Sequence, residues 1–205
     1  MWKEVNNMEK EIRGGIGNIE IRADEEKDNE LYAEGYALVF NSWSEDLGGF
    51  VETIEPSALE GSDLSDVRAL FNHNADKVLA RSTAGTLELE TDNKGLKFRF
   101  KLPNTSYGKD VAENLRNGNI NQCSFGFVLD DDGDSFDFDE KRSIYQRTLK
   151  KIKSVMDISL VTYPAYSSTS AAPALRSIDK IENELLEQRQ LQHEKEKLKL
   201  ELELL

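Results

Sequence analysis

The sequence predicts a mainly β domain with peripheral α-helices, followed by a helical tail. Short runs that alternate apolar and polar residues recur between turn residues, which is the pattern of antiparallel strands. The best internal helix candidate is residues 107–117, where Val111 and Leu115 are four residues apart and Gly118 serves as a C-cap. Residues 176–205 contain no Gly, Pro or aromatic residue and are rich in Leu, Glu, Lys and Gln, which favour a helix.

The predicted strands follow one another with few helices between them. Residues 96–102 are the clearest, because their apolar side chains share one face and their basic side chains the other. An acidic turn joins the first two strands into a hairpin, and Pro56 starts a short helix after the third. In chain order the strands are 16–23, 31–40, 50–54, 67–71, 86–90, 96–102, 124–129, and segments near 143–150 and 154–162. This pattern predicts a closed or partly closed antiparallel β-barrel, or a sandwich, with helices outside it.

Changes in composition predict where the folded domain begins and ends. We expect a flexible N-terminus at 1–10, a folded domain over 11–166, a Ser/Ala/Pro linker over 167–175 and a helical tail over 176–205. Leucines recur every seven residues in the tail, but other apolar residues there follow a different register. The tail is therefore predicted to be a helix with weak coiled-coil potential.

The charge balance indicates which partners the chain does not suit. Its 205 residues include 26 Lys and Arg against 39 Asp and Glu, a formal net charge of −13. A nucleic-acid binder needs clustered basic residues to neutralise phosphates, so this balance argues against such a partner. Hydrophobic residues make up 38% of the chain, which is low for a wholly globular protein. We place the polar excess in acidic loops at 24–30 and 130–140 and in the tail.

Cysteine and histidine are too few for a typical metal centre. The single cysteine, Cys123, excludes an intrachain disulfide and a thiolate zinc site, and the two histidines of the chain argue against a histidine-rich site. The acidic run 130–140 does not fit the calcium-loop template, because Gly133 at the sixth position would place Val128 at the first. We therefore expect neither a metal nor a cofactor.

The distribution of apolar residues bears on location. No apolar run approaches the length of a transmembrane helix, and the polar first residues do not resemble a signal peptide. We expect a protein of the reducing cytoplasm that is neither secreted nor bound to a membrane.

Three residues of the β-rich region are candidates for catalysis. His73 is the only histidine there and follows an apolar strand, where it could act as a base. Ser124 lies on the opposite face of its strand from the neighbouring phenylalanines, next to Gly126, which would let a substrate backbone approach. Asp157 lies in a strand that is apolar on both faces, where a carboxylate needs a partner such as a histidine N–H.

Each candidate also has a purely structural interpretation. His73 could be an ordinary loop histidine, Ser124 an ordinary strand serine, and Asp157 an acceptor for backbone amides. Cys123 competes with Ser124 as a nucleophile, since thiolates react more strongly. Free cysteine is more often a small buried hydrophobic residue, and Cys123 faces the other side of its strand. His193 lies in the polar tail and is interpreted as a solvated helix residue.

Six segments in a fixed order resemble the caudovirus prohead serine protease family, which processes tailed-phage capsids and is similar in fold to herpesvirus assemblins. The resemblance extends from about residue 11 to residue 173. The segments include the runs GYALVFN, ALFNHN, NQCSFGF and ISLVTYPAY, and their ranges are 35–41, 50–59, 69–74, 79–87, 118–127 and 158–166. The resemblance implies a barrel of the herpesvirus-protease type.

The resemblance also implies roles for the candidate residues. The histidine of the family aligns with His73 and its nucleophilic serine with Ser124. Assemblins use a second histidine as the third catalytic residue, whereas the phage enzymes use an acidic residue on the strand before the Pro-Ala motif. Asp157 stands on that strand and would orient His73. Three other carboxylates compete for this role, namely Asp76, Asp92 and Asp110.

The function implied by the resemblance is that of a serine endopeptidase of phage capsid maturation. Its substrates would be the scaffolding protein, or a scaffold-like segment of the major capsid protein, and the chain itself. It would act in the host cytoplasm inside the assembling prohead, with the tail packaging it by helix contacts and with a homodimer, as in assemblins, left open. The alternative is a non-catalytic capsid-assembly or scaffold-interacting protein that keeps a protease-like fold.

Overall fold

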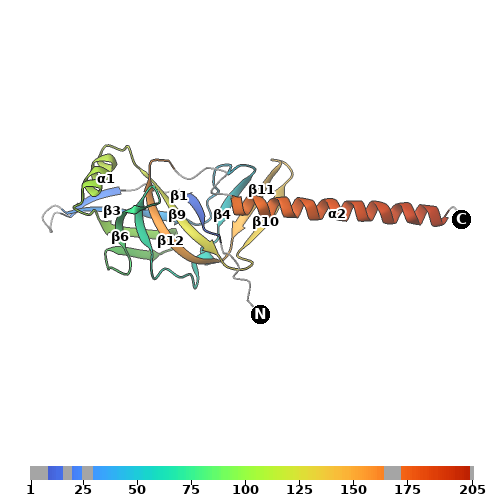
Figure 1. Ribbon diagram of the computed structural model, residues 1–205, viewed down its shortest axis with the longest axis horizontal. Coiled ribbons are helices and arrows are strands. Elements are labelled where there is room, and N and C mark those ends of the chain that lie inside the picture. The colour runs from blue at the N-terminus through green and yellow to red at the C-terminus, as the bar shows by residue number, and fades with distance from the viewer. Residues whose placement is uncertain (1–8, 16–19, 25–29, 164–171, 204–205) are drawn as a thin grey trace. The chain divides into compact units, whose positions relative to one another are not determined.

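The computed structural model describes residues 9–15, 20–24, 30–163 and 172–203. Two compact units, Met1–Ala171 and Ala172–Leu205, make up the chain, and each is described by itself. Strands dominate the first unit, where they are accompanied by a short 3-10 helix, η1, at Pro56–Leu59 and by helix α1 at Ser106–Arg116 (Figure 1). The predicted mainly β class is therefore confirmed.

The largest sheet contains the strands of the candidate residues. Its neighbouring strands are antiparallel, except that β12 runs parallel to β5. In spatial order it consists of β1 (Glu11–Gly15), β9 (Gln122–Leu129), β12 (Ile152–Val161), β5 (Arg68–Phe71) and β6 (Asn74–Arg81). Segments far apart in the sequence thus become neighbours, which is the condition for a composite site.

Two smaller sheets complete the first unit. The four-stranded sheet is antiparallel and includes the predicted hairpin, although residues 16–19 and 25–29 lie outside the described part. Its order is β2 (Glu20–Asp24), β3 (Glu30–Val39), β8 (Gly95–Lys101) and β7 (Leu87–Thr91). The three-stranded sheet pairs β11 in parallel with β4, and its order is β10 (Asp134–Asp139), β11 (Ile144–Leu149) and β4 (Phe50–Ile54).

The sequence predicts a closed or partly closed antiparallel barrel, and no closed barrel is found among the described residues. A barrel closes only when every strand is hydrogen-bonded on both sides. Here the strands form three separate sheets, and no ladder among the described residues joins an edge strand of one sheet to another sheet. Two parallel pairings, β12 with β5 and β11 with β4, also depart from the antiparallel expectation.

Three strands escaped the sequence prediction. β1 lies entirely before the first predicted strand, and β6 begins with polar residues that gave no strand signal. The acidic run 130–140 was predicted to be a loop, but β10 occupies much of it. Its poor strand formers are held by the neighbouring strand, since Phe138 packs edge-on against Tyr145 with ring centroids 5.0 Å apart.

The core lies between the sheets and follows the predicted alternation. On β8 the phenylalanines Phe98 and Phe100 are buried, with their ring centroids 5.9 Å apart. On β9 the rings of Phe125 and Phe127 stack at 5.1 Å in the same core. Because side chains alternate along a strand, this apolar face of β9 leaves Ser124 on the other face.

Helix α1 lies within one residue of the predicted helix 107–117 at each end. The side chain of Thr105 accepts a hydrogen bond from the backbone N–H of Gly108 at 3.1 Å and caps the first turn. Val111 and Leu115 are buried on the inner face. Gly118 follows the C-cap residue with φ of 71°, a left-handed conformation that glycine adopts without strain.

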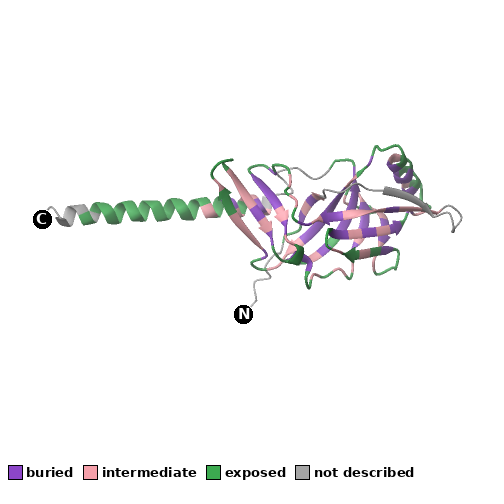
Figure 2. Cartoon of the chain, turned by 180° about the vertical axis from the view of Figure 1, so that it is seen from behind, coloured by how far each residue is buried: buried purple, intermediate pink, exposed green. Residues whose placement is uncertain are grey.

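The second unit is one long helix, α2, at Ala172–Glu203. It begins four residues before the predicted tail and takes in the end of the predicted linker, because Pro173 is tolerated in the first turn of a helix. Residues 167–171 of the linker lie outside the described part, as do residues 1–8 and 204–205. Leu185, Leu186 and Leu191 are exposed on α2, most of which is drawn in the exposed colour in Figure 2.

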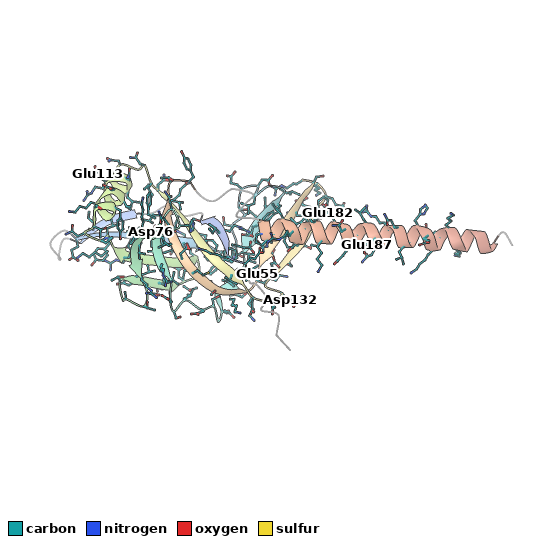
Figure 3. The ribbon with its side chains drawn as sticks, in the orientation of Figure 1. Glu55, Asp76, Glu113, Asp132, Glu182 and Glu187 are labelled. Carbon is teal, nitrogen blue, oxygen red and sulfur yellow. The ribbon has the colours of Figure 1, made fainter. Side chains whose placement is uncertain are left out.

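The formal charge of −13 is carried largely at the surface of each unit. Asp76, Glu113 and Asp132 are exposed acidic residues of the first unit (Figure 3). Glu182 and Glu187 are exposed along α2. These carboxylates remain solvated, so they carry charge without a burial cost.

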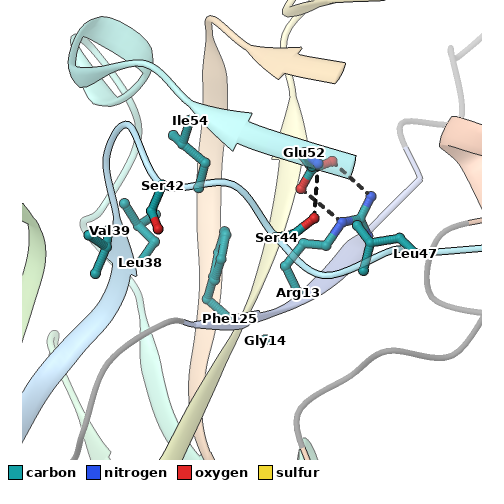
Figure 4. A pocket seen from close by; sticks show the side chains of 10 residues that line it. All are labelled: Arg13, Gly14, Leu38, Val39, Ser42, Ser44, Leu47, Glu52, Ile54 and Phe125. Atoms are coloured by element: carbon teal, nitrogen blue, oxygen red, sulfur yellow. Dashed lines mark hydrogen bonds and ion pairs between the residues drawn. The ribbon is translucent and has the colours of Figure 1, made fainter. Parts of the chain in front are cut away.

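A buried ion cluster joins β1 to the three-stranded sheet. The Arg147 guanidinium contacts Glu11 at 2.7 and 2.8 Å, Glu52 at 2.8 Å and Asp134 at 2.6 Å. Arg13 forms two hydrogen bonds to Glu52, at 2.9 and 3.2 Å (Figure 4). Burial lowers the pKa of Arg147, but the hydrogen bond to Glu11 and the charges of Glu52, Glu11 and Asp134 outweigh burial and raise it above its ordinary value. The Arg147 guanidinium therefore keeps its positive charge inside the cluster.

Removing the central cation should destabilise the fold. Arg147→Ala is expected to lower the free energy of unfolding by about 3–5 kcal/mol, because it leaves buried carboxylates without this partner. Urea denaturation of the purified variant and the unaltered chain measures the difference. Arg99→Ala is the control, since its side chain is 39% exposed and its ion pairs are 3.8 Å long, so its loss should stay within about 1 kcal/mol. Equal losses in the two variants would contradict the expectation.

Candidate active site

His73 occupies a tight turn between β5 and β6. Phe71 pairs with Asn74, so Asn72 and His73 form a two-residue hairpin turn with φ of 52° and 53°. Positive φ at both central positions suits the twist of a hairpin, and Asn and His adopt it more readily than most residues. The Asn72 N–H donates to the Leu160 carbonyl at 3.0 Å. The turn is thus anchored to β12, the strand that carries Asp157.

Ser124 and Asp157 lie on adjacent strands of the same sheet. Asp157 pairs with Gly126 on β9, two positions from Ser124, so both side chains emerge on one face. A Cβ added at Gly126 would come within 2.9 Å of Asp157 Oδ1 and would also overlap the Lys10 side chain. The sequence suggested that Gly126 makes room for a substrate backbone. In the structure it instead makes room for the ion pair between Lys10 and Asp157.

The three predicted residues form a continuous hydrogen-bonded chain. Asp157 Oδ2 lies 2.6 Å from His73 Nδ1, and His73 Nε2 lies 2.7 Å from Ser124 Oγ. The Ser124 and Asp157 residues are buried, with relative exposures of 0% and 2%. The His73 side chain is 16% exposed. This order of carboxylate, imidazole and hydroxyl is the arrangement of a serine-protease triad.

The charge on Asp157 determines the tautomer of the imidazole. Burial raises the pKa of Asp157, but hydrogen bonds from His73 and Lys10 outweigh burial and hold that pKa below its ordinary value. The carboxylate is therefore ionised at neutral pH and accepts a hydrogen bond from the Nδ1–H group. In neutral His73 this leaves Nε2 without a proton, facing the Ser124 hydroxyl as an acceptor.

The three competing carboxylates lie elsewhere. Asp92 accepts a hydrogen bond from the Tyr36 hydroxyl at 2.7 Å, and Asp110 is exposed on α1. Asp76 is exposed on β6. Among the described carboxylates, it is Asp157 that contacts the His73 ring.

Cys123 does not have the surroundings of a nucleophile. It is fully buried on the core face of β9, and burial raises the pKa of its thiol to about 12. The thiol is therefore protonated at neutral pH and unreactive. As predicted, the side chains of Cys123 and Ser124 point to opposite faces of β9, which explains why two adjacent residues have such different environments.

Sequence reasoning missed several groups around the site. The Ser159 hydroxyl accepts a hydrogen bond from the His73 backbone N–H at 3.2 Å and lies 3.4 Å from Asp157 Oδ2. The sequence could have indicated Ser159, because a residue two positions after Asp157 on the same strand points to the same face. Lys10 forms an ion pair with Asp157, although it falls in the predicted flexible N-terminus. The Arg13 carbonyl accepts a hydrogen bond from Ser124 Oγ at 2.8 Å, which no local pattern indicated.

The described part of the chain shows neither a metal-binding cluster nor a membrane-spanning helix. Its His, Cys, Asp and Glu side chains form no group of three that could hold a metal ion. No helix within the described ranges is long and apolar enough to cross a membrane.

Comparisons with known proteins place the chain in a family. The family model described as caudovirus prohead serine protease matches residues 17–184. No curated protein sequence matches. Among solved structures, the bacteriophage T4 capsid assembly protease gp21 is similar with a TM-score of 0.43 and 12% identity, over 74% of this chain and 96% of that one. The family model covers most of the chain and both strands that carry Ser124 and Asp157, and on that match the chain belongs to the caudovirus prohead serine protease family.

Proposed function

We propose that this chain is a serine endopeptidase whose catalytic residues are Ser124, His73 and Asp157. The observation that supports this most directly is the hydrogen-bonded chain from Asp157 through His73 to Ser124, with contacts of 2.6 and 2.7 Å. Membership of a serine protease family supports the same reaction. A non-catalytic assembly protein would have no need for a buried, ionised carboxylate aligned with an imidazole and a hydroxyl.

The proposed reaction proceeds through an acyl-enzyme. Ser124 Oγ attacks the scissile carbonyl carbon while His73 Nε2 takes the hydroxyl proton. Asp157 holds the Nδ1 proton and stabilises the imidazolium that forms. His73 then gives its proton to the leaving amine, and water attacks the acyl-enzyme by the same route in reverse. Backbone N–H groups would stabilise the oxyanion.

We propose that the substrates are the scaffolding protein or a scaffold-like segment of the major capsid protein, together with the chain itself. Cleavage would take place inside the assembling prohead in the host cytoplasm. Residues 11–166 would carry the catalysis. The net charge of −13 supports protein substrates rather than the genome.

We further propose that α2 packages the enzyme by helix contacts with the scaffold. Its exposed leucines, Leu185, Leu186 and Leu191, offer apolar surface on a helix rich in charged residues. Exposed apolar side chains of a helix can pack against a partner helix.

Replacing the nucleophile tests the reaction. Ser124→Ala is expected to abolish cleavage of co-expressed capsid and scaffold proteins, with a loss of rate on the order of 10³-fold or more. Mass spectrometry of the co-expressed proteins reads out the cuts. Cys123→Ala, one residue away, is the matched control and should leave the cuts in place. Cuts that persist in Ser124→Ala and disappear in Cys123→Ala would assign the nucleophile to the thiol.

Replacing the carboxylate tests the role of Asp157. Asp157→Asn keeps the shape but removes the charge that holds the Nδ1 proton, so the cleavage rate should fall by about 10³–10⁴-fold. The initial rate of scaffold cleavage by the purified protein measures this, with circular dichroism to show that the variant is folded. Asp76→Asn, at an exposed aspartate, should cleave at the rate of the unaltered chain. Comparable rates in both variants would exclude Asp157 from the triad.

A helix-breaking substitution tests the packaging role of α2. Gln188→Pro in the middle of the exposed helix should destabilise it by about 3 kcal/mol and reduce incorporation of the enzyme into proheads. Gln188→Ala is the matched control and should be incorporated normally. Quantitative immunoblotting of purified proheads measures incorporation, and undiminished incorporation of the proline variant would exclude the packaging role.

A further inference from the structure

Strand β1 covers the proposed nucleophile. It pairs antiparallel with β9 in a register that places Gly14 opposite Ser124. Ser124 has no exposed surface, and its hydroxyl donates to the Arg13 carbonyl oxygen at 2.8 Å. A substrate carbonyl cannot reach Ser124 while β1 is in this position. Strand β1 therefore occupies the place that a substrate must take.

The way β1 is bound is also the way that an extended peptide would bind. β9 is paired with β12 on one side, and β1 fills its other side as the last strand of the sheet. Extended peptides commonly bind proteins by adding a strand to a sheet edge, so that backbone hydrogen bonds supply affinity and side-chain pockets supply specificity. The carbon that a serine nucleophile attacks is one covalent bond from the Arg13 oxygen that Ser124 contacts. Arg13 and Gly14 thus flank the position of a scissile bond.

The side chain of Arg13 lies in a pocket suited to a cation. Glu52, which is 4% exposed, accepts two hydrogen bonds from its guanidinium (Figure 4). The ring centroids of Phe50 and Phe127 lie 5.9 and 5.8 Å from the guanidinium carbon. A free space of about 40 Å³ lies beside Arg13 and Glu52. Planar, two-point contacts to a carboxylate favour arginine over other side chains.

Without β1, the charges of the Arg13 pocket would be unbalanced. Glu11 and Arg13 belong to β1, whereas Glu52, Asp134 and Arg147 belong to the three-stranded sheet. If β1 left, the carboxylates of Glu52 and Asp134 and the guanidinium of Arg147 would remain in the pocket, with one negative charge in excess. A buried carboxylate without a matching cation is costly, so an incoming arginine restores the balance.

We propose that β1 is bound as a substrate, that the Arg13–Gly14 peptide bond is a self-cleavage site, and that the enzyme selects extended peptides with arginine before the scissile bond. This proposal rests on the proposed protease function and names its substrate class. The family model begins at residue 17, so the cut removes a segment that precedes the matched region and leaves His73, Ser124 and Asp157 in place.

The proposed self-cleavage needs no reagent other than water. The single hydroxyl proton of Ser124 has two acceptors within reach, the Arg13 carbonyl and His73 Nε2, and attack uses the orientation toward Nε2. The Oγ–C bond forms, the bond from that carbon to the Gly14 nitrogen breaks, and His73 passes the proton to the new amine. Water then releases Arg13 as a carboxylate. Loss of residues 1–13 uncovers Ser124 for other substrates.

The self-cleavage site is tested in the full chain. Intact mass and N-terminal sequencing of the purified protein should reveal a product that begins at Gly14, and Ser124→Ala should stay uncut. Arg13→Gln should slow this cut about 100-fold, because it removes the two-point contact of the guanidinium with Glu52, whereas Arg13→Lys should retain part of the rate. Arg99→Gln, at a half-exposed arginine of β8, is the matched control and should be cut normally. Cleavage of Arg13→Gln at the same bond and rate would overturn the proposal.

Peptides supply a test that does not depend on the folding of variants. The unaltered chain is incubated with the peptide EKEIRGGIG, which copies residues 9–17, and with versions that carry Gln or Lys in place of the arginine. Cleavage after arginine at about 100 times the rate of the glutamine peptide is expected. Equal rates for the arginine and glutamine peptides would overturn the selectivity.

The outcomes separate this inference from the proposed function. Ser124-dependent cuts in capsid or scaffold proteins that follow residues other than arginine, with the peptide left intact, would overturn the inference and leave the protease function standing. The absence of any Ser124-dependent cut in capsid protein, scaffold, peptide or the chain itself would overturn both.

Discussion

The buried carboxylate of Asp157 is the constraint on which the arrangement of the site depends. An ionised carboxylate inside a protein is costly unless charged or hydrogen-bonding partners surround it. His73, Lys10 and Ser159 supply those partners from a turn, from the segment before β1 and from β12 itself. The demand of one charge therefore draws three parts of the chain together. The same demand fixes which nitrogen of His73 faces Ser124.

Charge also holds the segment that covers Ser124. Lys10 pairs with Asp157 at one end of that segment, and Arg13 pairs with Glu52 further along it. Buried ion pairs recover little more than the cost of desolvating them, so they position groups more than they stabilise the fold. A strand held in this manner can be exchanged for another peptide that brings the same charges. Access to the nucleophile and recognition of an arginine are thus linked through one set of residues.

Much of the site could be predicted from local pattern. Ser124 is assigned to the face opposite two core phenylalanines by alternation along β9, and Asp157 stands out as a carboxylate in an apolar strand. The alternation of 96–102 likewise predicts β8 and its buried rings. Ser159 was within reach of the same reasoning. In contrast, β1, β6 and β10 have weak strand signals and exist because neighbouring strands pair with them.

The mainly β class, the helical tail and the three residues that could form a triad follow from the sequence, since each depends on spacing over a few positions. That Asp157, rather than Asp76, Asp92 or Asp110, contacts His73 is a result of the three-dimensional fold. The division of the strands into three sheets and the position of β1 over Ser124 are results of the fold as well. These features depend on strand pairing between segments that are far apart along the chain. Alternation fixes which face a side chain takes, but carries no information on which distant strand lies beside it.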